Sequence, residues 1–147
     1  MDTLWASFGA NPVTSFYRRF NQWLNDPTRE AARLTRDARH VLDKIVALYA
    51  AEQAAKVAVC LSKSLLEARE AIGAAPSRRL DVVREIQRRH RTARRRNDQP
   101  ELSGLTLVLI ALHADELGEA GSDTRLIIDG FLEQWKHLAV DAADERT

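Results

Sequence analysis

The chain has 147 residues, 45% of them hydrophobic and 29% charged, with a formal net charge of +1. This length predicts a single domain, residues 1–147, with one sizeable core. The single cysteine, Cys60, excludes an intramolecular disulfide and a cysteine-cluster metal site. The longest apolar run, Leu105–Leu112, is too short to cross a bilayer, and no signal peptide is visible, so we expect a cytoplasmic protein without a membrane partner.

Every periodic segment has the 3.6-residue repeat of a helix, beginning near the N-terminus. Residues 1–10 contain a cluster of large apolar side chains and are interpreted as an N-terminal arm. Asn11-Pro12 and Asp26-Pro27 each combine an N-cap residue with proline at the first helical position. These two dipeptides predict the starts of the first two helices.

The stretch 28–72 contains neither glycine nor proline. Its apolar residues form two series with alternating spacings of four and three: Leu34, Ala38, Val41, Ile45 and Leu48, then Ala54, Ala58, Leu61, Leu65, Ala68 and Ile72. The two series are out of phase near Ala51–Gln53, so a straight helix cannot turn both toward one core. We therefore predict a kink, turn or break between Tyr49 and Lys56, which leaves open one long kinked helix or two helices.

Glycine and proline also separate the helices that follow. Gly73 and Pro76 mark a stop, after which Ser77 is expected to cap an arginine-rich helix over residues 77–96. Asn97 to Pro100 form the next break.

The segment 102–117 is apolar nearly all round, which predicts a central helix buried by its neighbours. Gly118 and Gly121 end it, and a last helix follows, with an acidic tail over residues 141–147 that is expected to fray. The predicted fold is an all-α bundle of five or six helices.

The near-neutral total charge conceals a dipolar chain. Residues 77–96 carry nine basic and two acidic side chains, a net charge of +7, whereas residues 97–147 carry three and eleven, a net charge of −8. Asymmetry of this kind favours a polyanion partner, head-to-tail association with other copies, or both.

The arginines of the 77–96 helix are ordered along one face. Arg84, Arg88, Arg91 and Arg95 fall within an arc of roughly 60°, because a helix turns about 100° per residue. We call these four residues the arginine row, and Arg94 lies beside them. A second basic row with the same spacing consists of Arg29, Arg33, Arg36 and His40.

Rows of guanidinium groups are typical of helices that bind phosphate, since arginine holds phosphate oxygens bidentately. If the two helices lie side by side, the rows form one track. Few aromatic residues interleave the rows and no base-reading pattern is evident, so we expect backbone contacts to DNA or RNA without sequence preference. The alternatives are a basic surface that neutralises the acidic C-terminal third of the chain, one that is simply solvated, and one that meets an acidic protein partner.

No enzyme class is indicated. The sequence lacks a nucleophile elbow, a glycine-rich phosphate loop and a catalytic carboxylate pair, so we expect no catalytic activity and no cofactor. The pairs His113/Glu116 and Glu133/His137 have helical spacing but depart from the di-iron pattern, and we expect no metal site.

In architecture and charge layout, the chain resembles the small all-helical subunits of CRISPR effector ribonucleoproteins. The features that carry the resemblance are the two basic rows and the opposed acidic C-terminal segment. It covers the whole chain but includes no diagnostic motif. It implies a non-catalytic subunit, present in several copies, that holds nucleic acid on a basic surface within an antiviral complex. The alternative function is that of a protein-interaction module: a helical protein–protein adaptor or a self-assembling scaffold.

Overall fold

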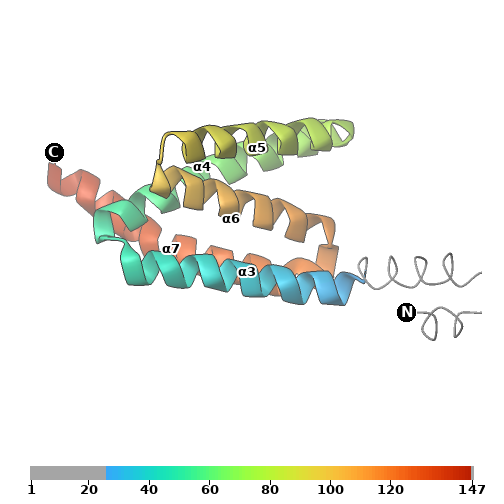
Figure 1. Ribbon diagram of the computed structural model, residues 1–147, viewed down its shortest axis with the longest axis horizontal. Coiled ribbons are helices and arrows are strands. Elements are labelled where there is room, and N and C mark those ends of the chain that lie inside the picture. Colours follow the sequence, from blue (N-terminus) through green and yellow to red (C-terminus); the bar gives the residue numbers. More distant parts are fainter. Residues whose placement is uncertain (1–25, 147) are drawn as a thin grey trace, which may run out of the picture.

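The computed structural model describes residues 26–146, and the side chains of residues 26–135. Within this range the chain is an all-α bundle of five helices without a strand (Figure 1). The elements are α3 (Pro27–Leu48), α4 (Ala51–Ala74), the 3-10 turn η1 (Pro76–Arg78), α5 (Arg79–Arg95), α6 (Gln99–Glu116), the 3-10 turn η2 (Gly118–Gly121) and α7 (Ser122–Arg146). The N-terminal arm and the helix expected after Pro12 lie outside the described residues.

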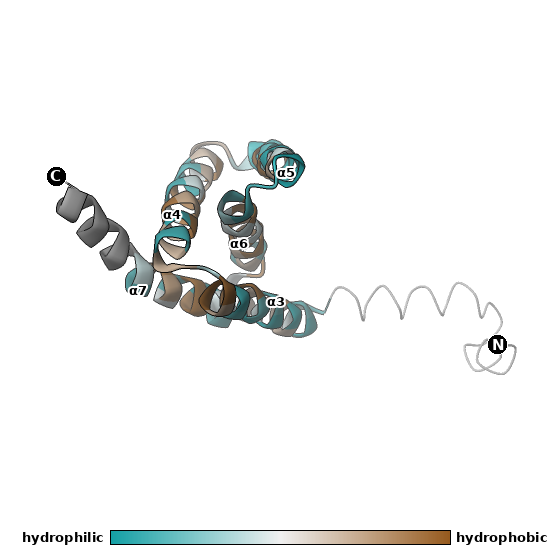
Figure 2. Ribbon diagram, turned by 60° about the vertical axis from the view of Figure 1, so that its left-hand side comes forward, coloured by the Kyte–Doolittle hydropathy of each residue, from teal (hydrophilic) through white to brown (hydrophobic). Residues whose placement is uncertain are grey.

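Helix α6 is the centre of the bundle, as its apolar sequence predicted. It packs against α3, α4, α5 and α7. In both ribbon views α6 lies between α5 on one side and α3 on the other (Figures 1 and 2). Its fully buried side chains include Leu105, Leu107, Val108 and Leu112. These meet Leu61 of α4, Ile45 of α3 and Ile128 of α7 in one core.

The predicted break in the stretch 28–72 is confirmed. Helix α3 ends at Leu48 and α4 begins at Ala51, with Tyr49 and Ala50 in extended conformations between them. The Tyr49 hydroxyl lies 2.9 Å from Ser103 Oγ in α6, which ties the corner to the central helix. Two helices with different orientations therefore turn both apolar series toward the core.

Local start and stop signals act largely as expected. Asp26 Oδ1 accepts a hydrogen bond of 2.9 Å from Thr28 N at the start of α3, and Asp98 caps α6. Gly118, with φ of 61°, follows the end of α6 in the left-handed conformation that glycine adopts without strain.

Three sequence expectations are corrected. Ser77 does not cap the arginine-rich helix: it lies in η1, and α5 begins at Arg79 with Arg78 at the N-cap position. Pro76 starts this 3-10 turn, which moves the helix start two residues along the chain. Helix α7 continues to Arg146, so residues 141–146 form its end rather than a separate tail. Leu48, placed in the core series, is 73% exposed because α3 ends there.

Candidate nucleic-acid interface

Helix α5 lies at the edge of the bundle and has two contrasting faces. Its inner face packs on α6 and α4 through Ile86 and Ala93, which are buried. All four members of the arginine row are exposed on the opposite face. Figure 2 shows α5 largely in the hydrophilic colour. The predicted division of this helix into an apolar and a basic face is therefore present in the structure.

Within the arginine row only Arg88 has an acidic partner among the described residues. Its Nε donates to Glu85 Oε2 at 3.0 Å, and this hydrogen bond lowers the pKa of the Glu85 carboxyl. No ion pair joins Arg84, Arg91 or Arg95 to a described side chain. Three guanidinium groups of the row thus face solvent uncompensated by the part of the chain that the structure describes.

Two other arginines of α5 hold the bundle together. Arg79 Nε donates to Glu116 Oε1 at 2.6 Å, and Arg79 also donates to the Leu112 carbonyl, both in α6. Arg89 donates to Ser64 Oγ in α4 at 3.1 Å and lies 3.6 Å from a carboxylate oxygen of Glu101. The local count of nine arginines therefore overstates the charge available to a partner.

The second basic row lies on α3 and is weaker. Arg29, Arg36 and His40 are exposed, but Arg33 lies 2.9 Å from Glu30 and 3.8 Å from Asp37. The hydrogen bond with Glu30 raises the pKa of Arg33 and lowers that of Glu30. Acidic neighbours on α3 thus neutralise part of this row.

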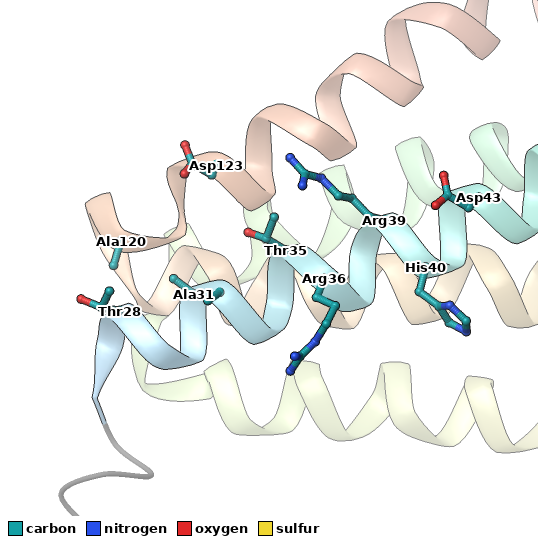
Figure 3. A pocket seen from close by; sticks show the side chains of 10 residues that line it. Thr28, Ala31, Thr35, Arg36, Arg39, His40, Asp43, Ala120 and Asp123 are labelled. Atoms are coloured by element: carbon teal, nitrogen blue, oxygen red, sulfur yellow. The ribbon is translucent and has the colours of Figure 1, made fainter.

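The two rows do not lie on adjacent helices. Helix α6 separates α3 from α5, so the condition for one track formed by side-by-side helices is not met. In Figure 3, Arg36 and His40 point away from α7, toward the side of the bundle on which α5 lies, whereas Arg39 points toward α7. All three side chains nevertheless line one pocket between α3 and the start of α7, together with the acidic residues Asp43 and Asp123.

Two histidines take part in the contacts between α6 and its neighbours α5 and α3. His90 Nε2 of α5 lies 2.9 Å from Thr106 Oγ1, and the Thr106 hydroxyl donates to the Leu102 carbonyl. Because that hydroxyl hydrogen is already used, His90 Nε2 acts as the donor. Burial, and to a lesser extent Arg94, lowers the pKa of His90. On the other side, His113 Nε2 lies 3.8 Å from Glu30 of α3.

The remaining candidate residues form no chemical site among the described side chains. No group of three or more His, Cys, Asp or Glu residues is placed to hold a metal ion there. His113 faces Glu30, and the side chain of His137 lies outside the described set. Cys60 is half-buried, and burial raises the pKa of its thiol. None of the described helices has both the length and the apolar character needed to cross a bilayer.

Sequence reasoning missed a groove between α4 and α5. Its lining combines apolar side chains of both helices, among them Ala68 and Ile86, with the charged side chains of Glu67, Arg78, Asp81, Glu85 and Arg89. Leu80, in the first turn of α5, is 57% exposed. The small side chains at the end of α4 were the only sequence signal, and alanine is equally common in closely packed helices.

Comparison with known proteins adds no assignment. No protein-family model, curated protein sequence or solved structure matches this chain.

Proposed function

We propose that this chain is a non-catalytic structural subunit that binds the phosphate backbone of nucleic acid through the arginine row of α5. The observation that carries the proposal is the exposure of Arg84, Arg91 and Arg95 on an edge helix, with no acidic side chain of the described residues paired to them. Like charges one turn apart destabilise a helix, so an anionic partner that separates them relieves a real cost. Phosphate suits them because arginine binds it bidentately.

The spacing along α5 supports a polymeric anion rather than a single phosphate. Residues three or four apart on a helix are about 5–6 Å from one another, so successive members of the row meet successive charges of a partner. Such contacts hold the backbone and carry no base information. We therefore expect binding that depends strongly on salt and weakly on sequence.

We further propose that the chain acts within a multi-subunit ribonucleoprotein. The support is the resemblance in size, helical architecture and charge layout to the small subunits of CRISPR effector complexes. The opposition between the +7 segment and the −8 segment suits head-to-tail contacts between copies. In such an assembly the arginine row lines the path of the nucleic acid, and neighbouring subunits fix its direction.

Copurification from the host tests this proposal. The untagged full chain, isolated with its native partners at low salt, should show an absorbance ratio typical of bound nucleic acid. Nuclease treatment followed by high salt should return the ratio to that of protein alone. A ratio typical of pure protein at low salt, together with no binding of added mixed-sequence DNA or RNA, contradicts the proposal.

A second candidate function is a helical protein–protein adaptor. The observation in its favour is the groove between α4 and α5, together with the exposed side chains of Leu80 and Leu66. An adaptor would meet acidic protein surfaces with its arginine row and would copurify with protein but without nucleic acid. The same absorbance measurement therefore separates the two functions.

A further inference from the structure

The described contacts place both basic rows on one side of the bundle. Thr106 and His113 are seven residues apart in α6 and share a face of that helix, which turns about 100° per residue. Thr106 contacts His90 of α5, whereas His113 contacts Glu30 of α3. The strip of α6 that carries both residues therefore borders both α5 and α3, and the ribbons show α6 between these two helices (Figure 2).

On each flanking helix, basic side chains lie next to the residue that contacts α6, which is His90 on α5 and Glu30 on α3. On α5, Arg94 and Arg91 follow His90 around the helix, on the side away from Arg89, which contacts α4. On α3, Arg33 follows Glu30, on the side away from Thr35, which bonds Thr124 of α7 at 2.9 Å, and Arg36 faces solvent between these two sides. Arg91 and Arg94 on α5 and Arg33 on α3 thus lie on the open side of α6, and the other members of each row continue around the helix from them.

The strip of α6 between the rows is free of uncompensated acid among the described residues. It consists of the half-buried residues Leu102, Thr106, Leu109 and His113. Glu116, at the end of this strip, is paired with Arg79 at 2.6 Å. Phosphates that approach from this side therefore meet positive charge on both flanks, partly neutralised on α3 by Glu30 and Asp37, and no uncompensated acid on the strip of α6 itself.

The distance between the two basic rows indicates whether the nucleic acid is single-stranded or double-stranded. Adjacent packed helices lie about 8–10 Å apart, so the axes of α3 and α5 are separated by at most about 16–20 Å across α6. One phosphate strand follows one line and meets one row. The two strands of a double helix offer two lines, on either side of a major groove about 12 Å wide.

We propose that the basic side of the bundle binds double-stranded nucleic acid, with α5 on one strand and α3 on the other. This inference rests on the proposed function and adds the form of the ligand to it. Arg36 is its decisive residue, since it lies on the far row, is exposed and points toward the side of α5 (Figure 3). Its contact exists only when the partner has a second strand.

The test compares Arg36→Gln with Arg39→Gln in the full chain. Both substitutions remove one exposed charge from α3, but Arg39 points toward α7 (Figure 3). Fluorescence titrations at several salt concentrations use a mixed-sequence DNA duplex longer than two helical turns and each of its strands alone. An RNA duplex of the same sequence identifies which double helix fits better.

Arg36→Gln should weaken duplex binding about two- to fivefold, the size of an exposed ionic contact. It should also flatten the dependence of log K on log salt by about 0.9. Single-strand binding should be unchanged, and Arg39→Gln should affect neither ligand. Equal losses for the two variants on both duplexes, or an equal loss for duplex and single strand with Arg36→Gln, overturn the inference. In either case the arginine row on α5 still binds nucleic acid, so these results refute only the contact of α3 with a second strand and not the proposed function. Absence of binding by the wild-type chain refutes the proposed function itself.

Discussion

Removal of the three uncompensated charges of the arginine row gives the most direct measure of its role. The variant replaces Arg84, Arg91 and Arg95 by glutamine and keeps Arg88, because Arg88 is already paired with Glu85. Each phosphate contact contributes about 0.9 to the log–log salt slope on a duplex and about 0.7 on a single strand. The triple variant should therefore lose about 2.7 units of slope on a duplex and about 2.1 on a single strand.

The triple variant should also bind nucleic acid more weakly than the wild type. If each exposed contact is worth about two- to fivefold, the three together reduce binding about ten- to a hundredfold at low salt. The loss should be alike for unrelated sequences, since backbone contacts do not read bases. Fluorescence titrations across a range of salt concentrations measure the slope and the affinity together.

The fold should tolerate the change. All three side chains are exposed, and glutamine has a helix propensity close to that of arginine. Relief of like-charge repulsion between residues one turn apart opposes the loss of a favourable charge at the C-terminal end of α5. The circular dichroism spectrum and the midpoint of urea unfolding should accordingly stay close to those of the wild type.

A matched control removes the same charge elsewhere. Lys56→Gln, Lys63→Gln and Arg39→Gln in one chain change the net charge by the same amount, at exposed positions on α4 and α3. If affinity depended only on net charge, the two triple variants would bind equally. Equal binding, or an unchanged slope in the Arg84, Arg91 and Arg95 variant, would show that the row makes no phosphate contacts.

Three further predictions concern stability. The pKa of His90 in the folded chain lies below its ordinary 6.5, so the unfolded chain binds more protons than the folded chain as the pH falls. The unfolding free energy of the wild type should therefore decrease from about pH 7 to about pH 5 more steeply than that of His90→Gln. Equal slopes for the two proteins would contradict this prediction. Ala50 is the N-cap of α4 without a side-chain cap, so Ala50→Ser should raise the unfolding free energy by about 0.5–2 kcal/mol in urea titrations, whereas a decrease would argue against the cap geometry. A Cβ at Gly121 would collide with the backbone of Ala114, so Gly121→Ala should cost about 3 kcal/mol, and a loss below about 1 kcal/mol would show that η2 can shift.

The sequence alone determined much of the fold, because the relevant signals are local. Asp26-Pro27 predicted a helix start from a residue that contacts its own first turn, and the predicted break at Asn97 to Pro100 contains Asp98, which caps α6 in the same way. The phase change near Ala51 predicted the corner between α3 and α4, since a helix with a fixed repeat cannot turn two offset stripes to one core. The division of α5 into a basic and an apolar face follows from the same periodicity.

Only the tertiary structure decided what each charge does. The sequence places Arg79 off the arginine row but does not say what it contacts: Arg79 binds Glu116, 37 residues away, whereas Arg84 is exposed without an ion pair to the described side chains. The relation of the two basic rows likewise depends on α6, which lies between them and sets their separation. Helical periodicity fixes the face on which a side chain lies, but its partners come from segments distant in the chain. That pairing is set by packing, which no local pattern encodes.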